Sequence, residues 1–533
     1  MWTILKNLRT TRHRLLSTFV PEPEEPCIIT SIPGPATCAM KGELENFQCV
    51  ECLDLFVNYK SSSGNYLVDI DGNKFLDLAN QATIPLGYNH PCLEELFSES
   101  DTLIHLINRP ALNQFPFDLL LPKVKCLITA ASPKLPLLTT TKCATCANEG
   151  AITAMMKAYQ NQERSGCVSD VSLKTAINNQ HPGSPDLSIL SFKGSDHGCE
   201  TMGALSMSHS NAEDKVDVTA FDWPIAQFPR YKHPLNEFEC YNKHQDKKCL
   251  QSVRELLSTS KENGSPIAGV MVEPIQNKGT YEASADFFRD LQEICKENGC
   301  FLCMDETKTC CGVTGTLWCH EQFGLKCPPD VVTFGNQAQL SGYFHSEELC
   351  SQGNCACCGD PTKMLAFERI LKTIDIDSLL CNVQHAGEIL HRHITQLEME
   401  YFPLIDSVRG KGVFIAFNAQ NEQVRDDLVE RLRGRGMLVD TFGHKTISLR
   451  PSLTFNLKHV ELFAQILAEV LDDAVAFSSS NPCVKWPEIK KPCQKKKKQC
   501  PRGTERDRCS KEKHKKPLCT DKCTPKKKKP CDD

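Results

Sequence analysis

The sequence predicts an α/β fold built on a mostly parallel sheet, followed by a smaller α+β domain. Between residues 120 and 345, short apolar runs alternate with helical stretches, a pattern typical of strands joined by crossover helices. From 376 to 475 the pattern changes to long helices with a few short strands. With 533 residues, 40% of them apolar, the chain is long enough for two or three hydrophobic cores.

The N-terminal part begins with a connector rich in proline and glutamate, and Leu44–Leu55 has helical character. Farther along, apolar side chains at Tyr66, Val68 and Ile70 recur at every second position before an Asp-Gly turn. Alternation that ends at such a turn indicates a β-hairpin, here within Asn58–Leu78.

Buried strands and intervening helices follow one another through the α/β part. The predicted strands are Cys126–Ala130, Leu187–Phe192, Ile267–Val272, Phe301–Met304 and Val331–Phe334, and the helices are Ser252–Asn263 and Phe287–Asn298. Glu273, Asp305 and Asn336 each stand just past one of these strands. Because the carboxyl ends of parallel strands meet at one edge of a sheet, we expect these three side chains to converge there.

The smaller domain is predicted to contain two long helices, Leu379–Tyr401 and Val460–Phe477, and two strands, Gly410–Phe417 and Ile447–Leu449. After residue 477 the periodic pattern stops. Residues 482–533 hold 19 Lys or Arg against 7 Asp or Glu, a balance of +12, so the remainder of a chain with net charge −5 carries −17. A tail of this composition cannot bury a core.

The first twenty residues resemble a mitochondrial transit peptide. Lys6, Arg9, Arg12 and Arg14 alternate with leucines at helical spacing, and no acidic residue precedes Glu22. The alternative is an ordinary basic N-terminus. No run approaches the 18 apolar residues of a transmembrane helix. The expected organisation is therefore 1–26 transit peptide and connector, 27–120 N-terminal segment, 121–375 large domain, 376–477 small domain and 478–533 disordered tail.

Several motifs together resemble one family, the mitochondrial 4-aminobutyrate aminotransferases of class III. They are Asn108–Leu112, Gln180–Phe192, Phe221–Arg230, Val272–Gln276, Asp305-Glu306 and Val408–Gly412, and the likeness covers about residues 27–475. This resemblance implies the pyridoxal-phosphate fold type I with a seven-stranded sheet. It also implies a homodimer in the mitochondrial matrix with pyridoxal 5'-phosphate at the subunit interface, and a role in 4-aminobutyrate catabolism.

The cofactor contacts that the resemblance implies are partly kept. Asp305 matches the carboxylate that protonates the pyridine nitrogen, although an ordinary strand-end Asp is the alternative. Ala144 and Thr145 match a Gly-Ser phosphate cradle at a helix start, and Ala356 matches a threonine from the partner subunit. The family's glutamine next to the cofactor is here Lys308. Loss of one charged hydrogen bond weakens such a cradle by roughly 1.5–3 kcal/mol.

Other positions depart from the family. Asp196 replaces the aromatic residue that stacks on the cofactor, and Cys199-Glu200 replaces the arginine that binds the substrate carboxylate. A glutamate there repels an anionic substrate. Lys278 and Ser448 replace a family Glu–Arg ion pair, so both of its members have changed.

Asn336 stands where the family has its Schiff-base lysine. An amide is not nucleophilic and does not exchange protons at neutral pH, so it supplies neither function of that lysine. Lys278 and Lys308 are the candidates for rescue, because a desolvated lysine can act as a nucleophile. The simpler interpretation is that both are solvated or paired lysines in a decaying pocket.

Thirty-one cysteines are many for an intracellular protein of this size. Cys143 and Cys146 match a family pair that implies a [2Fe–2S] cluster, since two thiolates from each of two subunits give the four that such a cluster requires. A redox pair and chance spacing are the alternatives. Seven cysteines lie in the tail, which suits cross-linking or docking on an acidic partner. Nucleic-acid binding is disfavoured because no aromatic residue is interleaved with the basic repeats of the tail, such as Lys490–Cys493 and Lys526–Cys531.

We therefore predict a catalytically degenerate relative of these aminotransferases with a structural or assembly role. The alternatives are an active 4-aminobutyrate:2-oxoglutarate transaminase that uses a non-standard lysine, and a protein that binds the cofactor or an amino acid without catalysis.

Overall fold

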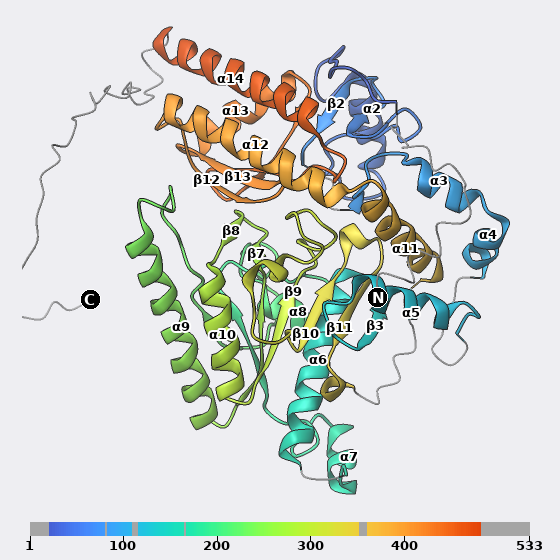
Figure 1. Cartoon of the computed structure of the whole chain (residues 1–533), viewed down its shortest axis with the longest axis vertical. Coiled ribbons are helices and arrows are strands. Elements are labelled where there is room, and N and C mark those ends of the chain that lie inside the picture. The colour runs from blue at the N-terminus through green and yellow to red at the C-terminus, as the bar shows by residue number, and fades with distance from the viewer. Residues whose placement is uncertain (1–20, 80–82, 109–115, 165–166, 351–359, 481–533) are drawn as a thin grey trace, which may run out of the picture. The chain divides into compact units, whose positions relative to one another are not determined.

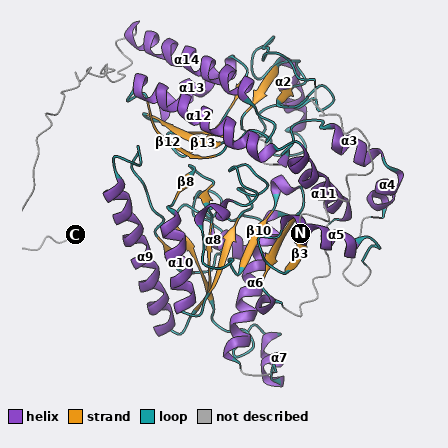
Figure 2. Cartoon of the chain, in the orientation of Figure 1, coloured by secondary structure: helices purple, strands orange, loops and turns teal. Residues whose placement is uncertain are grey.

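The computed structural model describes residues 21–79, 83–108, 116–164, 167–350 and 360–480. Within these ranges seven strands form the largest sheet, in the order β3-β11-β10-β9-β6-β4-β5. Figure 2 shows its strands, among them β3 and β10, in orange with helices around them. Their bounds are β3 Leu137–Thr141, β4 Ser188–Phe192, β5 Ile225–Ala226, β6 Ile267–Val272, β9 Phe301–Asp305, β10 Val331–Phe334 and β11 Ser341–His345. Strand β11 runs antiparallel to both of its neighbours, while β4, β5, β6, β9 and β10 pair in parallel. The predicted α/β fold with a mostly parallel sheet is confirmed.

Alternate residues of the central strands face two helical layers. Ile189, Met271 and Cys303 pack against helix α6, Ala144–Glu163, in one buried cluster. Their neighbours, among them Leu190, Val272 and Met304, belong to the cluster that contains the apolar residues of α9 (Glu239–Glu262) and α10 (Ala285–Glu297). Figure 1 shows α9 and α10 side by side. Helices therefore cover both faces, which is why these strands are almost wholly apolar.

Three predicted elements were wrong. Gly410–Phe417, expected as one strand, contains the end of β12 (Ile405–Lys411), a turn and the start of its antiparallel partner β13 (Phe414–Ala419). Cys126–Ala130 lies inside helix α5, Leu120–Ala131, where buried Leu127 and Ala131 are four residues apart on one helical face. A short apolar run fits a strand or a buried helix equally well. Helical character at Leu44–Leu55 was also misplaced, because helix α2 spans Pro35–Leu44 and ends where the predicted segment begins.

The predicted N-terminal hairpin is confirmed. Strands β1 (Tyr66–Val68) and β2 (Lys74–Asp77) pair antiparallel, and β14 (Met437–Leu438) adds to β2 in parallel. The N-terminal segment is thus joined to the C-terminal part through a shared sheet.

A second sheet lies near the C-terminal end of the described chain. It contains β12 (Ile405–Lys411), β13 (Phe414–Ala419), β16 (Thr446–Leu449) and β15 (Asp440–Phe442), in that order, and all pairs are antiparallel. Its helices are α12 Leu379–Tyr401, α13 Glu422–Gly434 and α14 Leu457–Ser480 (Figure 1). The predicted α+β character of this part is confirmed, although the domain boundaries stay a prediction.

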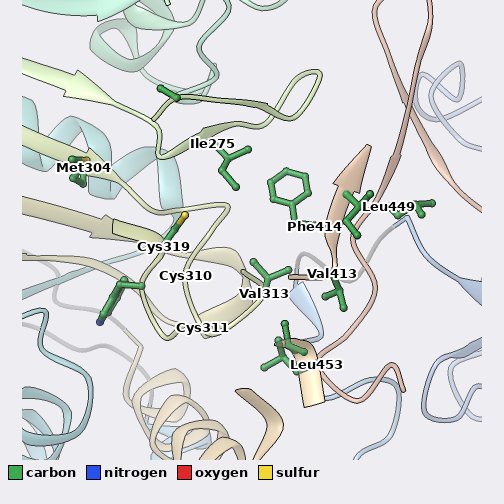
Figure 3. Close-up of a cluster of buried hydrophobic side chains, with 14 of the residues drawn as sticks. Ile275, Met304, Cys310, Cys311, Val313, Cys319, Val413, Phe414, Leu449 and Leu453 are labelled. Atoms are coloured by element: carbon green, nitrogen blue, oxygen red, sulfur yellow. The ribbon is translucent and has the colours of Figure 1, made fainter. Parts of the chain in front are cut away.

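The core continues from the large sheet to this second sheet. Ile275, Val313 and Phe414 point toward one another in Figure 3 and belong to one buried cluster with Leu449 and Leu453. The backbone N–H of Val413 donates to the carbonyl of Val313 at 3.1 Å.

Shorter elements complete the described chain. They are α3 Pro91–Ser98, α4 Ser100–Ile107, α7 Asp170–Ala176, α8 Met202–Met207, α11 Pro361–Ile376, β7 Ile275–Gln276, β8 Tyr281–Glu282 and the 3-10 turns η3 Cys319–Phe323, η4 Asn336–Ala338 and η5 Glu347–Leu349. None of the helices in the described ranges has the length and apolar character needed to cross a membrane.

The contact of α6 with the sheet depends on Gly269. A Cβ atom there would meet the sulfur of Met155 at 2.5 Å and the carbonyl oxygen of Phe301 at 3.2 Å. We expect Gly269→Ala to lower the free energy of unfolding by about 1–3 kcal/mol through overpacking. Urea unfolding in a double-mutant cycle measures this loss of unfolding free energy, and Gly269→Ala should cause a smaller loss in a Met155→Ala background than in the wild type. Equal costs in both backgrounds would show that the sulfur contact is not the cause.

Candidate active site

The candidate site lies where the parallel strands end and helix α6 begins. Gly335, which follows β10, allows this approach, since a Cβ atom on it would meet the Cβ of Ala144 at 2.7 Å. Helix α6 begins at Ala144 with Cys143 as its N-cap, as the motif predicted. The end of β10 and the start of α6 are therefore in direct contact.

Asp305 ends β9 and is wholly buried. One of its oxygens, Oδ2, accepts from His197 Nδ1 at 2.6 Å and from Asn148 Nδ2 at 2.9 Å. The other, Oδ1, accepts from the backbone N–H of Thr307 at 2.9 Å, from the Thr307 hydroxyl at 2.6 Å and from the Thr333 hydroxyl at 3.3 Å. These donors take up the acceptor capacity of a carboxylate, which has about four lone-pair sites.

Burial alone would raise the pKa of Asp305, but the hydrogen bonds from His197 and Thr307 outweigh it and hold that pKa below its ordinary value. The carboxylate is therefore charged at neutral pH. Within the described residues, His197 Nε2 and Asn148 Oδ1 are buried without a hydrogen-bond partner. The His197 ring is therefore held through Asp305, and the Asn148 amide through Asp305 and the backbone carbonyl of His197, at 2.8 Å.

Asn336 lies at the end of β10 with φ at +47°, in the left-handed region that asparagine tolerates better than most residues. Its side-chain Nδ2 donates to the carbonyl of Thr307 at 3.0 Å. Since Thr307 also binds Asp305, the predicted convergence of Asn336 with Asp305 is confirmed.

Glu273, the third residue of that prediction, also lies near Asp305. Burial raises its pKa well above the ordinary value, and the charges of Asp305 and Asp196 raise it further. Its two oxygens accept from the backbone N–H groups of Asp196 and Asn277, each at 3.1 Å. Asp196 in turn accepts from Asn277 Nδ2 at 2.9 Å, and Arg450 Nη1 donates to Asn277 Oδ1 at 2.9 Å. A polar network thus occupies the region around Asp196.

Glu200 contacts the start of α6. The hydroxyl of Thr145 donates a short hydrogen bond to Glu200 Oε2. That bond is the main cause that lowers the pKa of the Glu200 carboxyl, and backbone N–H groups of Cys199 and Glu200 and the charge of Lys308 lower it further, against the effect of burial. The charged carboxylate of Glu200 therefore binds the hydroxyl of Thr145, which was predicted to contact the cofactor phosphate.

The fold and this arrangement can be compared with known proteins. A family model described as aminotransferase class-III matches residues 49–471. The mitochondrial 4-aminobutyrate aminotransferases of Sus scrofa and Homo sapiens are 39% and 38% identical to this chain over 456 residues, which is 84% of this chain and 91% of each relative. The chain belongs to the class-III aminotransferase family. A solved lysine aminotransferase from M. tuberculosis shares the fold, with a TM-score of 0.72 at 24% identity over 82% of this chain and 99% of that chain.

Class-III aminotransferases use pyridoxal phosphate. The side chains described above do not fit this cofactor in a covalent attachment. Asn336 offers no amine, and the Thr145 hydroxyl already donates to Glu200. Asp305, the residue expected to hold the ring nitrogen, already accepts from His197 and Asn148.

The two lysines that could rescue a class-III reaction lie in different loops, Lys278 between β7 and β8 and Lys308 after β9. Lys278, half-buried, has its Nζ 5.0 Å from the centre of the Phe442 ring. Ser448, which with Lys278 occupies the positions of the expected ion pair, has its hydroxyl oxygen 3.3 Å from that of Thr280. Lys308, also half-buried, lies where its charge acts on Glu200 and Cys199.

Cys143 is exposed and Cys146 is half-buried. The backbone N–H of Cys146 donates to Cys143 Sγ at 3.4 Å, and burial together with the Cys143 thiol raises the pKa of Cys146. Across the part of the chain that the structure describes, no group of three or more His, Cys, Asp and Glu side chains could hold a metal. Two thiols from one subunit are half of the set that a [2Fe–2S] cluster requires.

Some predicted features lie outside the described residues: Ala356, the N-terminal basic segment and the cysteine-rich tail. Conversely, sequence reasoning missed His197, Asn148 and Thr307 as partners of Asp305. One signal was available for Asn148, a polar residue between the buried Ala147 and Ala151 on α6.

Proposed function

We propose that this protein is a 4-aminobutyrate-aminotransferase-like homodimer of the mitochondrial matrix that no longer performs transamination and serves a structural or assembly role. The observation that carries this proposal is Asn336 at the end of β10. Its amide is engaged with the Thr307 carbonyl and has no nucleophilic nitrogen. A transaminase needs an amine there to hold its cofactor and move protons.

The charges of the pocket support the same proposal. Glu200 is ionised at the start of α6, and Asp196 is bound into the network with Asn277. Substrates such as 4-aminobutyrate and 2-oxoglutarate carry carboxylates, which these side chains repel. Arg450, a cation of this region, already donates to Asn277.

The proposal of a homodimer rests on the usual oligomeric state of this family and on an exposed apolar surface. Class-III aminotransferases are typically dimeric. On helix α4, the side chains of Leu103, Ile104 and Ile107 are 42%, 56% and 78% exposed, which is unusual clustering for a helix that faces only water.

A dimer would also bring together two Cys143–Cys146 pairs, and we propose that they hold a [2Fe–2S] cluster. Iron and sulfide content of the purified protein, compared with a Cys143→Ser/Cys146→Ser variant, tests this.

Mitochondrial location is supported by the names of the relatives and by the basic N-terminal segment. The tail, with seven cysteines and a balance of +12, suits cross-linking or an acidic partner, as an assembly role requires.

A turnover assay tests the proposal against its active alternative. The full-length protein is incubated with pyridoxal phosphate, 4-aminobutyrate and 2-oxoglutarate, and glutamate is measured. We expect no turnover above a heat-denatured control, and the same result for Lys278→Ala and Lys308→Ala. Turnover that either substitution abolishes would contradict the proposal and identify the lysine that acts in place of residue 336.

A further inference from the structure

The contact between Thr145 and Glu200 joins two elements that are 55 residues apart. Thr145 is the second residue of the twenty-residue helix α6 and is 6% exposed. The first N–H groups of an α-helix have no partner within the helix, and the helix dipole favours an anion at this end. Here the chain itself places a carboxylate at this end, on the hydroxyl of Thr145.

The loop that carries Glu200 is fixed to α6 on both sides. Before it, Gly198 lies so close that a Cβ atom would meet Thr145 Oγ1 at 2.3 Å and Thr145 Cβ at 2.9 Å, with φ at +113°. After it, Glu149 Oε2 accepts from the Thr201 hydroxyl at 2.7 Å and from the backbone N–H of Ala204 at 3.1 Å. Glu200 is therefore held between two attachments to the same helix.

A threonine hydroxyl has one proton to donate. Because Thr145 donates it to Glu200, this proton is not available to a phosphate at the same place. Two anions at this place would also repel each other, and because Glu200 is exposed, water weakens that repulsion. The half-buried Lys308 supplies a positive charge that favours the ionised form of Glu200.

We propose that Glu200 acts as an internal anion that occupies the phosphate position at the start of α6, so that this pocket selects ligands without a phosphate group. The inference rests on the proposed function, since it concerns the same pocket, and it names the ligand class. Pyridoxal or another unphosphorylated ring compound would enter, whereas pyridoxal 5'-phosphate would have to displace Glu200.

Calorimetry on the full-length protein tests this, with pyridoxal 5'-phosphate and pyridoxal as the two probes. Glu200→Gln removes the charge and keeps an oxygen that can accept from Thr145, and Glu200→Ala removes both. Asp214→Asn is the matched control, because Asp214 is exposed and its charge acts on Cys199 next to Glu200.

We expect affinity for pyridoxal 5'-phosphate to rise in Glu200→Ala by about 10- to 100-fold, the range for one hydrogen bond to a charged group. Glu200→Gln should give a smaller rise, Asp214→Asn should bind like the wild type, and pyridoxal should bind equally to all four proteins. Equal affinity of the wild type and Glu200→Ala for the phosphorylated probe, including no measurable binding by either, would overturn the inference. Turnover by the wild type would instead contradict the proposed function and leave this comparison intact.

Discussion

Replacing Asp305 with alanine is expected to lower the free energy of unfolding by about 3 kcal/mol or more. The loss leaves His197 Nδ1 and the Thr307 hydroxyl buried without this acceptor, while Asn148 Nδ2 keeps its bond to the His197 carbonyl. Such unpaired donors cost more than the hydrogen bonds themselves contribute. Urea unfolding followed by circular dichroism measures the change, and Asp214→Ala at an exposed position is the control.

The same carboxylate predicts the pH dependence of stability. Because the pKa of Asp305 is lower in the folded protein than in the unfolded chain, its stabilisation is fully present above the unfolded value of about 4 and is lost as the pH falls through the folded value. The stability difference between the wild type and Asp305→Asn should therefore be constant from about pH 5 to 8 and shrink in more acidic solution. A difference that grows on acidification would contradict this assignment.

Asn336→Lys is expected to give a protein that forms a borohydride-reducible adduct with pyridoxal. The end of β10 and the start of α6 are in place around residue 336, so the substitution restores an amine next to Asp305. It removes the hydrogen bond to Thr307 and places a lysine at φ +47°, at a cost of about 1–2 kcal/mol. With pyridoxal 5'-phosphate the adduct should form efficiently only when Glu200→Ala is added.

Mass spectrometry of the reduced protein locates the adduct. Asn336→Arg is the matched control, because it adds the positive charge without a nucleophilic amine. If Asn336→Lys folds and yet forms no adduct with pyridoxal, the expectation that the end of β10 and the start of α6 still accommodate a reactive lysine at residue 336 is contradicted.

Sequence reasoning found the central strands because β4, β6, β9 and β10 are continuous apolar runs that helices cover on both faces. It missed β3, whose Leu-Leu-Thr-Thr-Thr is only partly buried, and β11, whose Ser-Gly start does not resemble a strand. Cys126–Ala130 was wrongly predicted as a strand because its short apolar run fits a strand or a buried helix equally well. Only the packing of Leu127 and Ala131 on one face distinguishes the helix.

In the site, motifs gave individual positions but not their partners. Asp305 and Asn336 were predicted to lie close together because both follow strands of one parallel sheet, whose carboxyl ends meet at the same edge. The contact of Thr145 with Glu200 depends on the path of the loop after β4, which brings together residues 55 positions apart in the sequence. Likewise, His197 meets Asp305 across 108 residues, a pairing that local sequence does not encode.

If the proposed function holds, no lysine of this pocket replaces the one missing at Asn336. The most direct measurement is to incubate the full-length wild-type protein with pyridoxal 5'-phosphate, record its visible spectrum, reduce it with borohydride and map modified lysines by mass spectrometry. We expect no cofactor band and no more modification at Lys278 or Lys308 than at exposed lysines. A cofactor band like that of ordinary transaminases, with stoichiometric reduction onto either lysine, would contradict the proposed function.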